Sequence, residues 1–145
     1  MIFKSFEINK INKKINQLIL FYGKNEGLKN EALNILIKDE NNIQNYEEKE
    51  ILDNENNFIE NILSKSLFEK EKFIVIKRTT DKILKVIETL HLKNLEDTTI
   101  ILNSDNLEKK SKLRSLFEKD KKLICVPFYP DNDQTLSKLA YNFLS

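Results

Sequence analysis

The sequence predicts an α/β domain of three layers, in which helices cover both faces of a mainly parallel five-stranded sheet. Short apolar runs of strand length alternate about five times with segments whose apolar residues recur at helical spacing. The runs at residues 18–22 and 73–76 are continuously apolar, which is typical of strands covered on both faces. No Pro/Gly linker, repeat or low-complexity tail divides the 145 residues, so residues 1–145 are expected to form one domain.

The first half of the chain predicts its elements from apolar spacing. Loose alternation over residues 2–8 indicates an edge strand, and residues 10–16 indicate a short polar helix. After the strand at 18–22, a helix begins near residue 26. Its stripe at 3.6 spacing consists of Leu28, Ala32, Leu33, Leu36 and Ile37. The acidic, Asn-rich segment that follows contains a short predicted strand near 50–52.

The second half predicts three strands and four helices. A helix is expected at 57–66, a strand rich in β-branched residues at 73–76, and a helix capped by Thr80 after it. The next strand is expected at 98–102. The last elements are a helix opened by a capping box of Asp105 and Glu108, a strand at 123–128, and a helix opened by Asp131 and Gln134 that reaches Phe143.

Composition excludes several classes of protein. The net charge of +1 predicts no strong attraction to nucleic acid or acidic lipid, although the first 30 residues are basic and residues 31–60 acidic. The single cysteine, Cys125, excludes an internal disulfide and suits the reducing cytoplasm. No apolar run approaches the roughly 20 residues that span a bilayer, and the N-terminus has no signal-peptide pattern.

The strand at 18–22 and the turn and helix after it have the layout of a phosphate-binding loop. On the pattern G-x-x-x-x-G-K-[ST], Gly23 and Lys29 fit. Leu28 stands at the second glycine, Asn30 at the hydroxyl position, and Gly27 lies one place early. The residues that would hold a phosphate and its metal are therefore mostly missing, and a simple strand-to-helix turn is the alternative.

An active enzyme of this kind also needs an acid after a second strand to hold Mg²⁺. The strand at 73–76 is followed by Lys77 and Arg78, which have the wrong charge, and Asp105 after the strand at 98–102 is better explained as a helix cap. These losses argue against ATP hydrolysis. A nucleotide-binding protein that uses Lys29 unconventionally remains the alternative function.

Other catalytic arrangements have weaker signals. The lone His91 lies near a helix end, where a surface or capping role is expected, and Cys125 lies in an apolar strand as a small core residue. No Cys/His spacing predicts a metal site, and no cofactor is expected.

An apolar pair at Leu67 and Phe68 stands between a predicted helix and the strand at 73–76, flanked by charged residues. One interpretation continues the helical stripe through Leu67 into the core. The other is an exposed plug, because adjacent helical side chains point about 100° apart and do not easily share one buried stripe. Apolar anchors of this kind concentrate binding energy in a partner's pocket.

Four segments together resemble the N-terminal domain of the delta subunit of bacterial DNA polymerase III, the clamp-loader wrench. They are the loop region 20–28, Ser66-Leu67-Phe68 with the strand from Lys72, the helix region 107–118, and Val126-Pro127-Phe128-Tyr129. The resemblance spans nearly the whole chain and implies a P-loop or AAA+-like fold that neither binds nor hydrolyses ATP.

The resemblance also implies a function and partners. Ser66, Leu67 and Phe68 would bind the hydrophobic pocket of the ring-shaped sliding clamp (the beta subunit), and a nearby helix would favour the open ring. The chain would be no enzyme by itself but part of the DNA polymerase III holoenzyme, a DNA-directed DNA polymerase and nucleotidyltransferase complex, in DNA replication in the cytoplasm. The family's lid and collar domains, which hold the loader subunits together, have no counterpart here, so clamp contact without stable assembly is expected.

A further hypothesis concerns DNA. The basic run Lys109, Lys110, Lys112 and Arg114 predicts phosphate contacts with a steep salt dependence. The alternative is a solvated helix face.

Overall fold

The computed structural model describes residues 1–13, 15, 17–38, 42–64, 71–93, 95 and 97–129. Its elements are η1 (Ser5–Lys10), β1 (Leu18–Tyr22), α1 (Glu26–Ile37), β2 (Ile43–Glu47), α2 (Glu48–Asp53), α3 (Glu55–Leu63), β3 (Lys72–Thr79), η2 (Asp81–Ile83), α4 (Leu84–Leu92), β4 (Thr98–Ser104), α5 (Lys112–Lys119) and β5 (Ile124–Pro127).

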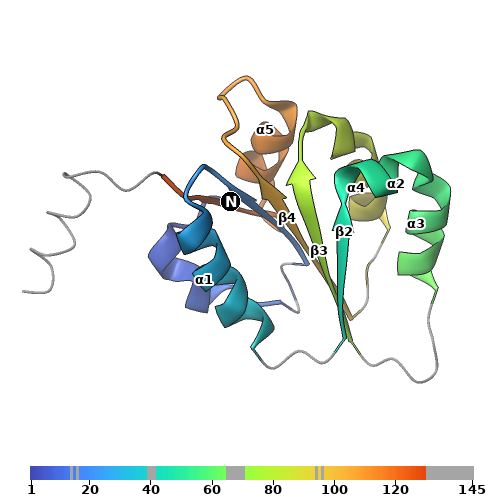
Figure 1. The fold of residues 1–145 in the computed structure, drawn as a ribbon, viewed down its shortest axis with the longest axis horizontal. Coiled ribbons are helices and arrows are strands. Elements are labelled where there is room, and N and C mark those ends of the chain that lie inside the picture. The colour runs from blue at the N-terminus through green and yellow to red at the C-terminus, as the bar shows by residue number, and fades with distance from the viewer. Residues whose placement is uncertain are drawn as a thin grey trace, which may run out of the picture.

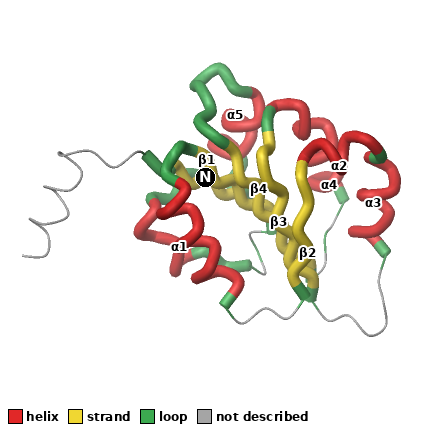
Figure 2. The backbone as a smooth tube through the Cα atoms, in the orientation of Figure 1, coloured by secondary structure: helices red, strands yellow, loops and turns green. Residues whose placement is uncertain are grey.

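The five strands form one sheet in the order β2-β3-β4-β1-β5, and every strand pair in it is parallel. Figure 2 shows the strands side by side with helices around them. The predicted three-layer α/β fold is therefore confirmed. Strand β1 lies inside the sheet between β4 and β5, so its carboxyl end, where the glycine turn begins, is surrounded by other strand ends.

The helices divide between the two faces as right-handed crossovers require. The chain crosses from β1 to the far edge at β2 and then returns through β3 and β4 toward β5, so the first crossover helix and the later ones fall on opposite faces. Helix α1 covers one face with η1, and α2, α3, α4 and α5 cover the other (Figure 1).

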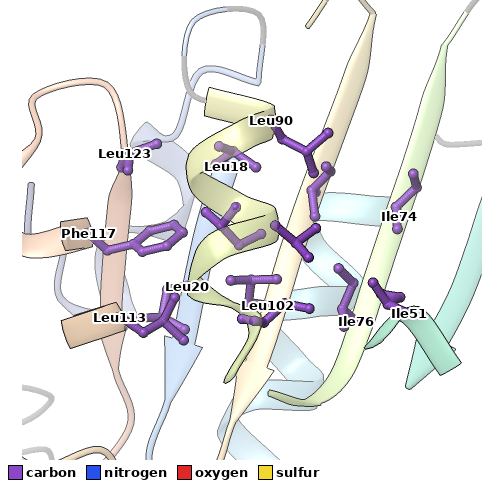
Figure 3. Packing of buried hydrophobic residues seen from close by; sticks show 14 of the residues in the cluster. Leu18, Leu20, Ile51, Ile74, Ile76, Leu90, Leu102, Leu113, Phe117 and Leu123 are labelled. Atoms are coloured by element: carbon purple, nitrogen blue, oxygen red, sulfur yellow. The ribbon is translucent and has the colours of Figure 1, made fainter. Parts of the chain in front are cut away.

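Two apolar clusters form the core, one on each face. In β1, Leu18, Leu20 and Tyr22 enter the cluster under α4 and α5, whereas Ile19 and Phe21 enter the cluster under α1. Successive strand side chains point to opposite faces, so a strand covered on both must be apolar throughout. Figure 3 shows the first cluster, where helical side chains such as Leu90 and Phe117 lie over the strands.

The N-terminal prediction is wrong in its element types. Among the described residues before β1, only the backbone around Ile2 pairs with the sheet, through a single bridge to Cys125, and residues from Ser5 then form a 3₁₀ helix that ends at Lys10. The apolar residues Phe6 and Ile8 therefore belong to a short 3₁₀ helix and not to a strand with alternating faces. Ile8 is buried against the α1 face, while Phe6 is 78% exposed.

The predicted strand near 50–52 is also wrong. The strand is β2, and Ile51 and Leu52 belong to α2, where Ile51 is buried. A pair of apolar residues does not distinguish a helix from a strand. The sequence analysis did not predict β2, because a strand at the edge of the sheet can be polar and its sequence, IQNYE, has no apolar run.

The helix signals of the second half are partly confirmed. Thr80 accepts a hydrogen bond from the Lys82 amide at the start of η2, as predicted. The capping box at Asp105 and Glu108 is wrong: α5 begins later, with Ser111 as its N-cap. The predicted helix 57–66 is α3, which begins earlier, at Glu55, and ends earlier, at Leu63, because Ser64 has extended backbone. The predicted final helix from Asp131 lies outside the described residues.

Candidate functional site

The glycine turn is a short, crowded connection between β1 and α1. Only Gly23, Lys24 and Asn25 lie between the two elements. Gly23 has a φ of 124°, and a Cβ atom there would lie 1.9 Å from the carbonyl oxygen of Phe128. The glycine is therefore required by the close approach of the chain after β5. Its amide donates to the Asp105 carbonyl at 3.3 Å.

The N-terminus of α1 is capped from within the chain. The Asn25 side chain accepts from the Leu28 amide at 3.1 Å and donates to the Tyr129 carbonyl at 3.1 Å. In a phosphate-binding loop, amides at this place point at the phosphate. Gly27 lies in the first turn of α1, where an added Cβ would meet only the Asn25 side-chain oxygen, at 3.7 Å. The position therefore has no steric need for glycine.

Lys29 lies inside the protein, with 1% of its surface exposed. Its Nζ donates to the Ser104 carbonyl at 3.0 Å and lies 2.7 Å from Glu26 Oε1. The Ser104 hydroxyl is hydrogen-bonded in turn to the Thr79 hydroxyl. The ammonium that would meet a phosphate is thus already matched by a carbonyl dipole and a carboxylate. The burial of Lys29 could have been predicted from helical spacing, because Lys29, Ala32 and Leu36 lie on the same, buried side of α1.

The carboxyl ends of β3 and β4 supply polar groups of other kinds. Lys77 and Arg78 are exposed, and Arg78 has a φ of 57° where the register between β3 and β4 shifts. The buried acid at this edge is Glu48, which accepts from the amide and hydroxyl of Thr80. Within the described ranges, no group of three or more His, Cys, Asp or Glu could hold a metal ion.

The predicted clamp-binding residues Ser66, Leu67 and Phe68 lie outside the described residues. Their flanks are described. The carboxyl end of α3 at Ser64 and the start of β3 are joined by Lys72, whose Nζ donates to the carbonyls of Asn61 at 3.0 Å and Ser64 at 3.2 Å.

The basic run around the start of α5 divides into two parts. Lys109, Lys110 and Lys112 are exposed. Arg114 points back to the fold: it donates to the Leu107 carbonyl at 2.9 Å and to Glu118 at 3.1 Å. Its guanidinium also lies 5.0 Å from the ring centre of Tyr22, a cation–π contact. The lysines and Arg114 therefore do not present one common surface.

The two remaining candidate residues, Cys125 and His91, contact only other parts of the fold in the described structure. Cys125 is fully buried, and burial raises the pKa of its thiol to about 12, so it is a core residue as predicted. His91 Nε2 lies 2.9 Å from Asp120 Oδ2 and joins the ends of α4 and α5. Burial opposes ionisation of Asp120, but hydrogen bonds from the Lys122 amide and His91 outweigh it and lower the pKa of Asp120.

No protein-family model matches the chain, and no curated protein matches it by sequence. Among solved structures, the Bacillus subtilis DNA clamp loader delta protein (YqeN) is similar, with a TM-score of 0.72 and 15% identity. The similarity covers 95% of this chain and 46% of that one, so this chain spans about half the length of that protein. Over nearly its whole length, this chain therefore has the fold of the matching half of a clamp loader delta protein, as the resemblance implied.

Proposed function

We propose that this chain is a clamp-binding domain of a DNA clamp loader, acting in DNA replication without ATPase activity of its own. The observation that carries the proposal is the delta-like fold combined with the burial of Lys29, the lysine of the phosphate-binding pattern, against partners inside the protein. On this proposal its partners are the sliding clamp and the other loader subunits of the DNA polymerase III holoenzyme in the cytoplasm. No helix within the described ranges is long and apolar enough to cross a membrane.

The turn after β1 supports the part of the proposal that concerns ATP. Phosphate binding needs backbone amides and a lysine directed at the ligand. Here the amides of Gly23 and Leu28 and the Lys29 ammonium have partners inside the protein. A nucleotide would have to displace these contacts, and the exposed Lys77 and Arg78 provide no ligand for Mg²⁺.

The clamp contact is assigned to Leu67 and Phe68, with Ser66 beside them. A small apolar plug suits a pocket in a partner because a few buried anchors supply most of the affinity of an interface. The segment follows α3 directly, and α3 ends with Leu63 at the surface, 36% exposed.

The test is the affinity of the chain for the sliding clamp of the same organism, comparing wild type with Leu67→Ala/Phe68→Ala. We expect at least a tenfold loss, since truncating each anchor costs more than about 1 kcal/mol. The matched control is Phe6→Ala/Leu92→Ala, which removes two exposed apolar side chains elsewhere, at 78% and 87% exposure. Equal affinity of wild type and the Leu67/Phe68 variant would refute the site.

The alternative function is unconventional nucleotide binding through Lys29. The observation that favours it is the retained layout of strand, glycine turn and helix, with Lys29 at the carboxyl edge of the sheet. Measurable ATP affinity that Lys29→Met abolishes would support it against the first proposal.

DNA contact through the loader is a separate proposal for the exposed Lys109, Lys110 and Lys112, while Arg114 is held by the fold. Each phosphate contact should change the slope of log affinity against log salt by about 0.9 for duplex DNA. If a triple Lys→Gln variant binds DNA with an unchanged slope of log affinity against log salt, these lysines do not contact DNA phosphates.

A further inference from the structure

We propose that the groove between α4 and α5 binds the acidic helix α3 of a second copy of this chain. The inference goes beyond the proposed function, because it concerns contact between copies of the chain and uses none of the proposed clamp-binding residues. Two described surfaces carry it: a groove flanked by lysines, and a helix whose exposed side is acidic.

The groove lies between α4 and α5 and has a volume of about 630 Å³. Its apolar residues are Leu84 and Leu116, which are partly buried and pack against the core. Lys112 and Lys119 line it from α5, about two helical turns apart, and both are exposed. The groove therefore combines a small apolar surface with two cations on one wall.

The charges that line the groove favour an acidic ligand. No ion pair within the described ranges engages Lys112 or Lys119. Two acids also line the groove, but Asp120 already accepts a hydrogen bond from His91, which leaves Glu88 on the α4 wall. Two cations against one available carboxylate make the groove attractive to an acidic segment that carries an apolar side chain.

Helices α2 and α3 of the same chain have this chemistry. From Glu48 to Leu63 the sequence contains five acidic residues and one lysine. Glu60 and Leu63 are both exposed and lie three residues apart, so they share one side of α3. A carboxylate beside an apolar side chain on a helix matches the lysines and the apolar floor of the groove.

The groove and α3 do not meet within one molecule. Helix α4 contacts α3 on one side and α5 on the other, so α3 would have to pass α4 to reach the groove (Figure 1). A contact between the two surfaces therefore joins two copies, and it is heterologous because each copy contributes a different surface. Each copy in such a pair keeps one unused surface, so association should continue beyond a dimer or close into a ring.

The experiment is sedimentation equilibrium of the chain without DNA, because Lys112 is also a candidate for DNA contact. The average mass should rise with protein concentration at low salt and fall in about 0.5 M NaCl, since salt screens exposed charges. Reversing the charges of the groove with Lys112→Glu/Lys119→Glu, or that of α3 with Glu60→Lys, should lower the association constant at least about tenfold, because attraction becomes repulsion.

Two further samples show whether the contact is specific. Lys24→Glu/Lys38→Glu makes the same change in net charge at the two ends of α1, on the other face of the sheet, and should associate like wild type. A mixture of the groove variant with Glu60→Lys should associate although neither variant does so alone. The groove of one variant and the α3 helix of the other are unchanged in this mixture.

Three results would overturn the proposal. The first is a wild-type chain that stays monomeric up to about 1 mM, a concentration at which even weak contacts are populated. The second is a mixture that does not associate although both variants have the thermal midpoint of wild type. The third is a monomeric wild type whose affinity for the sliding clamp is lost in the groove variant, because the clamp would then occupy the groove.

Discussion

The Nζ atom of Lys29 lies 3.0 Å from the carbonyl oxygen of Ser104 and joins helix α1 to the end of β4 inside the protein. The lysine that a nucleotide-binding protein would direct at its ligand is here a structural cross-link, with Glu26 at 2.7 Å as the balancing charge.

Lys29→Ala should lower the free energy of unfolding by about 1–3 kcal/mol, because it leaves the buried Ser104 carbonyl without its donor. Lys29→Met should cost less, since it keeps the packing volume. Urea unfolding measures both. A residue kept for a ligand would instead tolerate the change in the free chain, so unchanged stability of Lys29→Ala would contradict the structural role.

Alanine substitution of Gly23, in the connection after β1, and of Gly27, in the first turn of α1, should change stability in opposite directions. Gly23→Ala should destabilise by more than about 2 kcal/mol, because its Cβ would collide with the Phe128 carbonyl at a φ of 124°. Gly27→Ala, the matched control, should stabilise by about 0.5–1 kcal/mol, because the residue is helical and the new methyl has room. Thermal unfolding of the pair tests this, and equal effects would contradict the assigned geometry.

Arg78→Gly should leave stability unchanged or raise it by up to about 1 kcal/mol. The arginine occupies the left-handed region at a φ of 57°, and its ion pair with Glu47 at 3.5 Å is exposed and weak. Lys77→Gly, at the neighbouring strand position, should lower stability by about 0.5–1 kcal/mol. Chemical denaturation compares the two; a larger loss for Arg78→Gly would indicate that the register shift between β3 and β4 depends on the side chain.

Stability should decline in acid partly through Asp81. Hydrogen bonds from the Ser111 hydroxyl at 2.5 Å and from the Leu113 and Lys112 amides lower the pKa of Asp81. A carboxyl group whose pKa is lower in the folded state stabilises fully above its unfolded value of about 3.9, and this stabilisation is lost as pH falls through the folded value. Asp81→Asn should therefore be less stable at pH 7 and lose less stability between pH 5 and 3. Parallel pH curves would exclude the coupling.

The sequence predicts the central part of the fold, and the wrong predictions for other parts have physical reasons. Strand β1 was predicted to the residue because both faces bury it and only an apolar run satisfies that. The edge strand β2 carries no such signal. The N-cap of α5 is Ser111, whose hydroxyl donates to Asp81, thirty residues earlier in the chain. The residues near the helix start do not reveal this contact, and they suggested a capping box at Asp105 and Glu108 instead.

The candidate site was less accessible to sequence reasoning. The broken phosphate pattern was visible, but the internal partners of Lys29 and the collision that demands Gly23 arise from β4 and the chain after β5, far away in sequence. The contact from Lys72 to the end of α3 likewise joins two elements that are far apart in the chain, and no spacing rule for a single helix or strand reveals it.

On the proposed function, a domain with the layout of a phosphate-binding loop binds the sliding clamp and not a nucleotide. Calorimetric titration of the chain with the sliding clamp, in the absence and presence of ATP and Mg²⁺, tests it most directly. We predict binding to the clamp with the same Kd in both conditions and no binding of ATP alone. Absence of clamp binding, or a Kd that depends on ATP bound by this chain, would contradict the account.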